Sequence, residues 1–139
     1  MNTFTALLDR AGVTCPDDTL ADIEVPVLTG PQRQGDVGIW PCQPTASHAG
    51  LVTVGRDGVA VVRGETTGGN AHILHADGPV TWCPDSTGDL IALGTLTVPA
   101  GSVAWLIHTD EHGVNGIGPG SYRVTGKREQ AEEARRIAD

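Results

Sequence analysis

Several features that often reveal a protein's class are scarce in this chain of 139 residues. Aromatic residues make up only 4%, and there is a single lysine, Lys127. No apolar run approaches the roughly 20 residues of a membrane-spanning helix. The N-terminus lacks the basic start and the long apolar core of a signal peptide. We therefore expect a protein that is cytoplasmic when synthesised and does not enter a membrane.

Positive charge is also scarce, since the formal net charge is −8. Nucleic-acid binding needs a positive face, so this balance argues against a nucleic-acid partner. The one local basic cluster, Lys127-Arg128 with Arg135-Arg136, is interleaved with glutamates and is typical of a solvated helix face.

Cysteine is limited to three residues, Cys15, Cys42 and Cys83, with no CxxC spacing. Because an odd number at wide spacing does not fit a disulfide framework, we expect reduced, buried thiols. A metal site made by all three thiolates is the alternative.

Glycine and proline, by contrast, are plentiful, and they separate short apolar runs rich in β-branched residues. These runs recur about every ten residues, which is typical of sandwiches and barrels. The strongest hairpin signal is Arg56-Asp57-Gly58, an Asp-Gly turn between LVTVG and VAVVRG. We expect a mainly β, single-domain antiparallel β-sandwich or small jelly-roll-like barrel of eight or nine strands, with short N- and C-terminal helices.

The chain divides into three parts in this interpretation. Residues 1–22 form an N-terminal helix and arm, with Asn2 or Thr3 as its cap, and residues 23–126 form the β-domain. Residues 127–139 form a C-terminal helix whose apolar side is thin, so we expect it to pack on a neighbouring subunit. The expected interface residues are Trp40, Arg128, Arg135 and Ile137.

Four of the five histidines lie in two segments that could meet. His72 and His75 lie in the strand-like AHILH, where residues three apart point to opposite faces. His108 and His112 lie in HTDEH. If the two segments are neighbours, His72 or His75 converges with His108 and His112. Three imidazoles with a carboxylate would suit Zn²⁺, Fe²⁺ or Mn²⁺, an arrangement similar to small barrels of the cupin type.

Four motifs in order resemble a family of small proteins from actinobacterial and phage genomes, for which no activity is known. The motifs are RQGDV (33–37), RGETTGGNAH (63–72), LIHTDEHG (106–113) and PGSYRVTGKRE (119–129). The family pattern reads QGDV…GE-TGHAH…H-EH…PG-Y-V—RE, and the likeness spans residues 32–139. The resemblance implies an ordered set of histidines and a phage or actinobacterial source.

The chain departs from that pattern at Asn70, where the family has a histidine. Because an amide is a poor ligand for transition metals, the departure weakens an inherited metal site. The alternative is that the histidines are structural and bond carbonyls or carboxylates at strand ends.

Sequence motifs of hydrolases, nucleotide-binding loops and metalloproteases are missing from the chain. We therefore expect a non-enzymatic structural or assembly protein without a cofactor, such as a capsid decoration or accessory protein of a phage virion. Its partners would be copies of itself or a shell protein. The alternative is a cupin-like metal-binding protein with a hydrolytic, isomerising or ligand-binding role. In it His72, His108 and His112 hold one divalent transition metal, and Glu111 or Glu65 acts as a base on metal-bound water.

Overall fold

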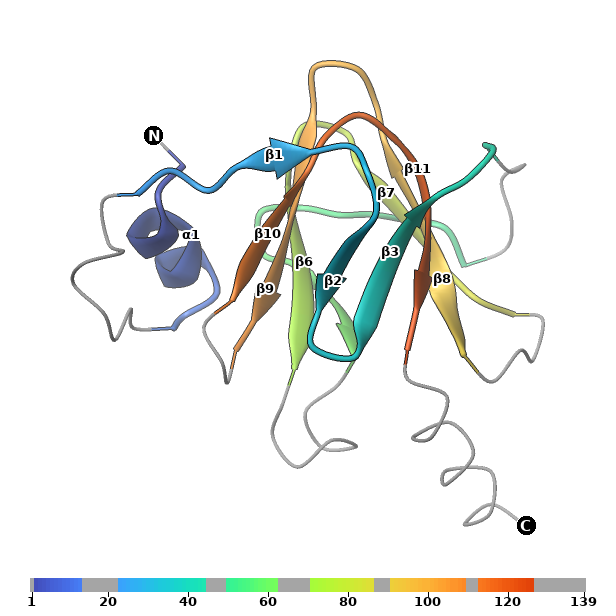
Figure 1. Ribbon diagram of the computed structural model, residues 1–139, viewed down its shortest axis with the longest axis horizontal. Coiled ribbons are helices and arrows are strands. Elements are labelled where there is room, and N and C mark those ends of the chain that lie inside the picture. Colours follow the sequence, from blue (N-terminus) through green and yellow to red (C-terminus); the bar gives the residue numbers. More distant parts are fainter. Residues whose placement is uncertain are drawn as a thin grey trace, which may run out of the picture.

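The computed structural model describes residues 2–13, 23–44, 50–62, 71–86, 91–109 and 113–126, which form a β-sandwich with one short helix (Figure 1). The two sheets, of five and six strands, face each other and are not closed into a barrel. The sandwich is therefore the correct one of the two architectures that the sequence left open. The expected C-terminal helix, residues 127–139, lies outside the described residues.

The five-stranded sheet has the order β1-β10-β9-β6-β5, and the six-stranded sheet has the order β2-β3-β11-β8-β7-β4. Neighbouring strands are antiparallel except β1 and β10, which are parallel. The strands are β1 (Val27–Leu28), β2 (Gln32–Gln34), β3 (Val37–Pro41), β4 (Val52–Thr53), β5 (Val59–Val62), β6 (His72–Asp77), β7 (Thr81–Pro84), β8 (Ala92–Val98), β9 (Val103–His108), β10 (Val114–Ile117) and β11 (Gly120–Thr125).

The described residues hold more strands than the eight or nine expected, because two segments that resemble turns are strands. Residues 32–34, which are all polar or charged, form β2 and pair with β3. Residues 114–117 form β10 and pair with β9. Neither segment shows the alternation of apolar and polar residues that identifies a strand in a sequence.

The predicted hairpin at Arg56-Asp57-Gly58 is wrong. β4, before this turn, pairs with β7 in the six-stranded sheet, whereas β5, after it, pairs with β6 in the five-stranded sheet. Gly58 has φ +90°, so the segment does turn sharply, as the sequence indicates. A local turn signal specifies a change of direction but not the strand's partner, and here the chain passes from one sheet to the other. The connections from β6 to β7 and from β8 to β9 also change sheets.

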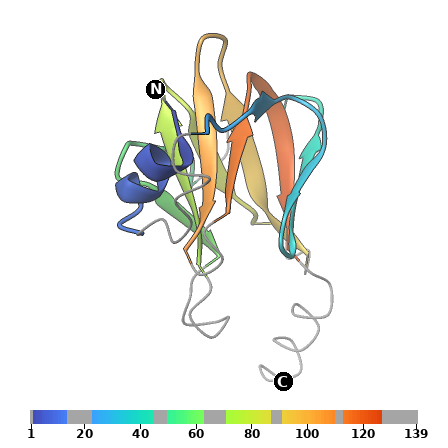
Figure 2. The same ribbon diagram turned by 60° about the vertical axis from the view of Figure 1, so that its left-hand side comes forward.

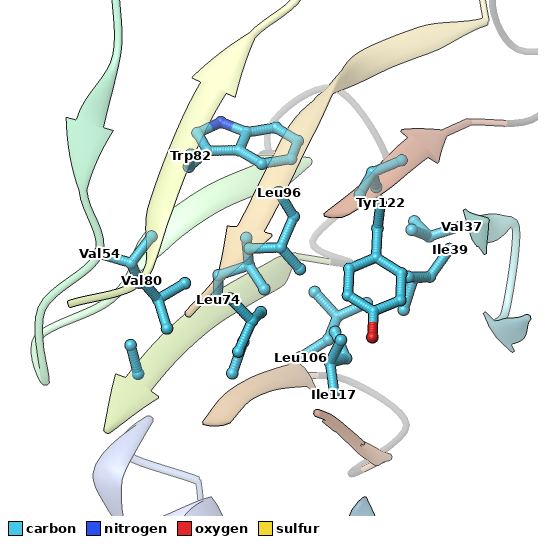
Figure 3. Close-up of a cluster of buried hydrophobic side chains, with 14 residues drawn as sticks. Val37, Ile39, Val54, Leu74, Val80, Trp82, Leu96, Leu106, Ile117 and Tyr122 are labelled. Carbon is cyan, nitrogen blue, oxygen red and sulfur yellow. The ribbon is translucent and has the colours of Figure 1, made fainter. Parts of the chain in front are cut away.

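The main core fills the space between the sheets (Figure 3). Alternate residues of the longer strands point inward, such as Leu74 and Ala76 of β6 or Leu96 and Val98 of β8, as the period of two in a strand requires. Tyr122 is buried there, and its hydroxyl donates to the Gly118 carbonyl at 2.8 Å. Other buried members are Val37, Ile39, Val54, Leu74, Val80, Trp82, Leu96, Leu106 and Ile117.

A second, smaller core lies on the outer face of the five-stranded sheet, under helix α1 (Phe4–Arg10) (Figure 2). Thr3, one of the two caps that the sequence predicts, caps this helix, since its hydroxyl accepts from the Ala6 N–H at 3.2 Å. Leu7 and Leu8 are buried against Trp105 and Ile107 of β9, together with Val25. A helix of two turns is unstable alone, so this apolar contact holds it in place.

Candidate functional site

His72 and His108 lie directly opposite each other on the neighbouring strands β6 and β9. Their ring centroids are 4.3 Å apart and the ring planes are inclined by 39°. Both side chains are buried, with relative exposures of 6% and 4%. His108 lies two residues beyond Leu106, which belongs to the main core, so the pair lies on the inner face of its sheet. We call this end of the sandwich, where β6 begins and β9 ends, the histidine end; it is the lower end in Figure 1.

Gln34 of β2 links the six-stranded sheet to this pair. Its Oε1 is 2.9 Å from His72 Nδ1. Its Nε2 donates to the Leu106 carbonyl at 2.7 Å and to Asn115 Oδ1 at 3.0 Å. Gly35 follows in the β2–β3 turn, and a Cβ added there would lie 3.7 Å from His72 Cε1, so this turn covers one edge of the ring. The histidine pair is therefore held by both sheets.

The environment of His72 disfavours its protonated form. Burial and, next, the neighbouring His108 lower the pKa of His72 from 6.5 to about 4, against a smaller opposing effect of Asp36. His72 is consequently a neutral imidazole near pH 7, which is the form that binds a metal ion.

Two of the three predicted metal ligands, His72 and His108, are thus neighbours, while His112 lies outside the described residues, as do Glu65, Asn70 and Glu111. Within the described ranges, no three His, Cys, Asp or Glu side chains gather closely enough to hold a metal ion. What the described residues offer is a pair of imidazole rings supported by an amide.

His75 points to the other face of the five-stranded sheet, as the strand period predicts. Its Nδ1 donates to the Arg56 carbonyl at 2.8 Å, and its Nε2 is buried without a hydrogen-bond partner among the described residues. Burial lowers the pKa of His75, and Arg10 contributes to the lowering, although the bond to Arg56 and the charge of Asp57 oppose it. His75 therefore stabilises the segment that joins β4 to β5 and contributes no ligand to the histidine end.

Asp77 is the centre of a charged cluster on that same outer face. Its carboxylate accepts from Trp105 Nε1 at 2.9 Å and forms ion pairs with Arg10 at 3.2 Å and Arg56 at 3.0 Å. Burial alone would raise the pKa of Asp77, but Trp105, Arg10 and Arg56 together outweigh it and lower the pKa. This cluster connects helix α1 to β6 and β9.

Trp40, the one predicted interface residue that the structure describes, lies on the outer face of the six-stranded sheet and is 40% exposed. Its ring lies over Gly38, where an added Cβ would approach Trp40 Nε1 to 2.6 Å. The indole N–H donates to Thr125 Oγ1 at 3.0 Å, and the Arg33 guanidinium lies 6.0 Å from the ring centroid. Arg128, Arg135 and Ile137 lie outside the described residues.

Two further expectations concern the cysteines and the membrane. Cys42 is a free thiol, as expected, but it is exposed, so its predicted burial is wrong, and Cys83 is only partly buried. Cys15 lies outside the described residues. Cys42 follows Pro41 at the end of β3, beyond the residues that face the core. In the part of the chain that the structure describes, no helix is long and apolar enough to cross a membrane.

Gln34 and Asn115 are the polar residues of the histidine end that sequence reasoning missed. Asn115 lies in β10, a strand with no sequence signal of its own. Gln34 is the first residue of the QGDV motif, so that motif is the sequence signal that could have found it.

Comparisons with known proteins give a family and no activity. No curated protein and no solved structure matches the chain. Residues 33–127, more than half of the chain, match the model of a domain of unknown function named DUF8820. The matched range begins one residue before Gln34 and spans every strand from β3 to β11. The chain belongs to the DUF8820 family.

Proposed function

We propose that the chain is a non-enzymatic assembly protein that works through protein–protein contacts on the outer face of its six-stranded sheet. The observation that carries the proposal is Trp40, a large aromatic side chain that lies flat and 40% exposed on that face. Tryptophan and arginine are the residues most enriched among the energetically dominant contacts of protein interfaces.

The surroundings of Trp40 support a contact surface. Arg123 of β11 is its direct cross-strand neighbour, and Arg33 of β2 lies beside its ring. Among the described residues no helix or strand covers this face, whereas α1 covers the outer face of the other sheet (Figure 2). The two arginines are basic residues beside Trp40 on a chain of net charge −8, so acidic side chains of a second copy would be complementary to them.

Self-association is the form of the proposal that can be tested directly. The setting that we propose is a phage virion, in which the protein would decorate the shell or act as an accessory component, with Arg128, Arg135 and Ile137 adding to the contact. The resemblance in the four sequence motifs supports such a source.

The test is the molar mass in solution, by light scattering during gel filtration, from micromolar to millimolar concentration. We expect an oligomer that Trp40→Ser dissociates. The matched control is Leu28→Ser, because Leu28 is 50% exposed but lies on β1 of the other sheet. A wild-type chain that stays monomeric throughout, or an oligomer that Trp40→Ser leaves intact, contradicts the proposal.

Metal binding is the second candidate function, and the observation that favours it is the contact between His72 and His108. In this role His72 and His108, with His112, would hold one divalent transition metal, and the ion would supply Lewis-acid chemistry or bind a ligand. The test is the metal content of protein purified without chelator or affinity tag. Near-stoichiometric metal that is lost in His72→Ala and His108→Ala supports this function, and metal-free protein contradicts it.

A further inference from the structure

The hydrogen bonds of Gln34 determine which end of its amide faces His72. One end lies 2.7 Å from the Leu106 carbonyl and 3.3 Å from the Gly113 carbonyl. A backbone carbonyl only accepts hydrogen bonds, so this end must be the NH₂ group. The amide oxygen therefore faces His72 Nδ1, at 2.9 Å.

Asn115 gives a second, independent reason for the same orientation. Its NH₂ group donates to the Arg33 carbonyl at 3.2 Å and to Gln32 Oε1 at 3.1 Å. The Asn115 amide oxygen is then the end that faces Gln34, 3.0 Å from Gln34 Nε2, and it can only accept. The two amides therefore point the same way along one chain of hydrogen bonds that ends at His72.

This chain of bonds determines which ring nitrogen carries the hydrogen in the neutral form of the His72 ring. Because the Gln34 oxygen accepts, His72 Nδ1 must donate and so carries the hydrogen. A neutral imidazole has one protonated nitrogen, so His72 Nε2 carries the lone pair. Metal-binding histidines commonly donate their other ring N–H to such an oxygen, which fixes both the tautomer and the direction of the ring.

We propose that Gln34 is a positioning residue that keeps the proton of His72 on Nδ1, so that His72 Nε2 and the His108 imidazole form a site for a borderline divalent transition metal such as Zn²⁺. The inference rests on the second candidate function, metal binding. Imidazole nitrogen is a preferred ligand of Zn²⁺, Cu²⁺ and Ni²⁺, whereas Mg²⁺ and Ca²⁺ prefer oxygen. His108 is the second ligand because it lies directly opposite on β9, with its ring centroid 4.3 Å from that of His72.

The first measurement is the tautomer of His72 in metal-free protein, from long-range ¹H–¹⁵N spectra at neutral pH. We expect a protonated Nδ1 and a bare Nε2 in the wild type, and loss of this preference in Gln34→Leu. The matched control is Gln32→Leu on the same strand, which leaves Asn115 its bond to the Arg33 carbonyl and should keep the wild-type tautomer. A protonated His72 Nε2 in the wild type overturns the proposal, even if Gln34→Leu does not fold.

The second measurement is a Zn²⁺ titration followed in the same spectra and by calorimetry. We expect one Zn²⁺ per chain, bound through His72 Nε2 and His108, with affinity at least about tenfold lower in Gln34→Leu and unchanged in Gln32→Leu. Zn²⁺ binding through the two histidines that is equally tight in Gln34→Leu overturns the role of Gln34 but leaves metal binding standing. Wild-type protein that binds no Zn²⁺ overturns both.

Discussion

Removal of the Asp77 carboxylate should loosen the contact between helix α1 and the five-stranded sheet. Asp77 accepts the indole N–H of Trp105, whose side chain is fully buried. In Asp77→Ala this N–H loses its acceptor, which costs about 1–3 kcal/mol of unfolding free energy. Loss of the ion pair with the mostly buried Arg10 adds about 1 kcal/mol. Arg56 is largely exposed, so its ion pair adds little.

The expected total for Asp77→Ala is therefore a loss of about 2–4 kcal/mol. Asp77→Asn should lose only about 1 kcal/mol, because the amide oxygen still accepts from Trp105. Urea unfolding followed by far-UV circular dichroism and tryptophan fluorescence measures both values. The matched control is Arg56→Gln, which removes the exposed partner and should change the free energy by less than about 0.5 kcal/mol.

The pH dependence of the stability that this cluster contributes is a second test of the same contact. Because the pKa of Asp77 is lowered in the folded state, the folded protein binds a proton there less readily than the unfolded chain. The stabilisation by the ionised Asp77 carboxylate is complete above its ordinary pKa of 3.8. It is lost as the pH falls through the lower pKa of the folded state. The difference between the wild type and Asp77→Asn should shrink in that window. An Asp77→Ala variant within about 0.5 kcal/mol of the wild type would refute the reasoning.

Three further substitutions test the turns, the core and the buried histidine. Gly58→Ala should lower the unfolding free energy, measured in urea, by about 2–3 kcal/mol, since φ is +90° and the new Cβ would lie 2.8 Å from His75 Cε1. A decrease of less than about 0.5 kcal/mol contradicts this. Tyr122→Phe removes the hydroxyl that donates to the Gly118 carbonyl. It should lower the unfolding free energy by about 1 kcal/mol with the fold unchanged, and an unaltered free energy would show that the bond contributes nothing. The pKa of His75 is lowered by burial, so the unfolded chain takes up its proton first and stability should fall as the pH drops below 6.5. His75→Gln should weaken this loss of stability in thermal melts, and an identical pH profile would contradict the assignment.

The residues of the histidine end were only partly predictable from the sequence. The spacing of His72 and His75 was enough to place them on opposite faces, because the period of a strand is a local property. The pairing of His72 with His108 was conditional on two segments lying side by side, and the register of β6 against β9 supplies that condition. Gln34 and Asn115 carry no chemical signature of a site on their own, since an amide acquires its role from the partners around it.

By itself the sequence determined the mainly β class, the sharp turn at Gly58, and an N-terminal helix capped at Asn2 or Thr3, of which the structure selects Thr3. These features follow from the conformational preferences of a few adjacent residues. Only the tertiary structure decided which strand pairs with which, because pairing depends on contacts between residues far apart in the chain. The turn at Gly58 illustrates the difference. Its residues specify a sharp turn, but β4 before it and β5 after it belong to different sheets and form no hairpin. Val54 near this turn and Leu74, which lies opposite β5, are both buried in the core that the two sheets share.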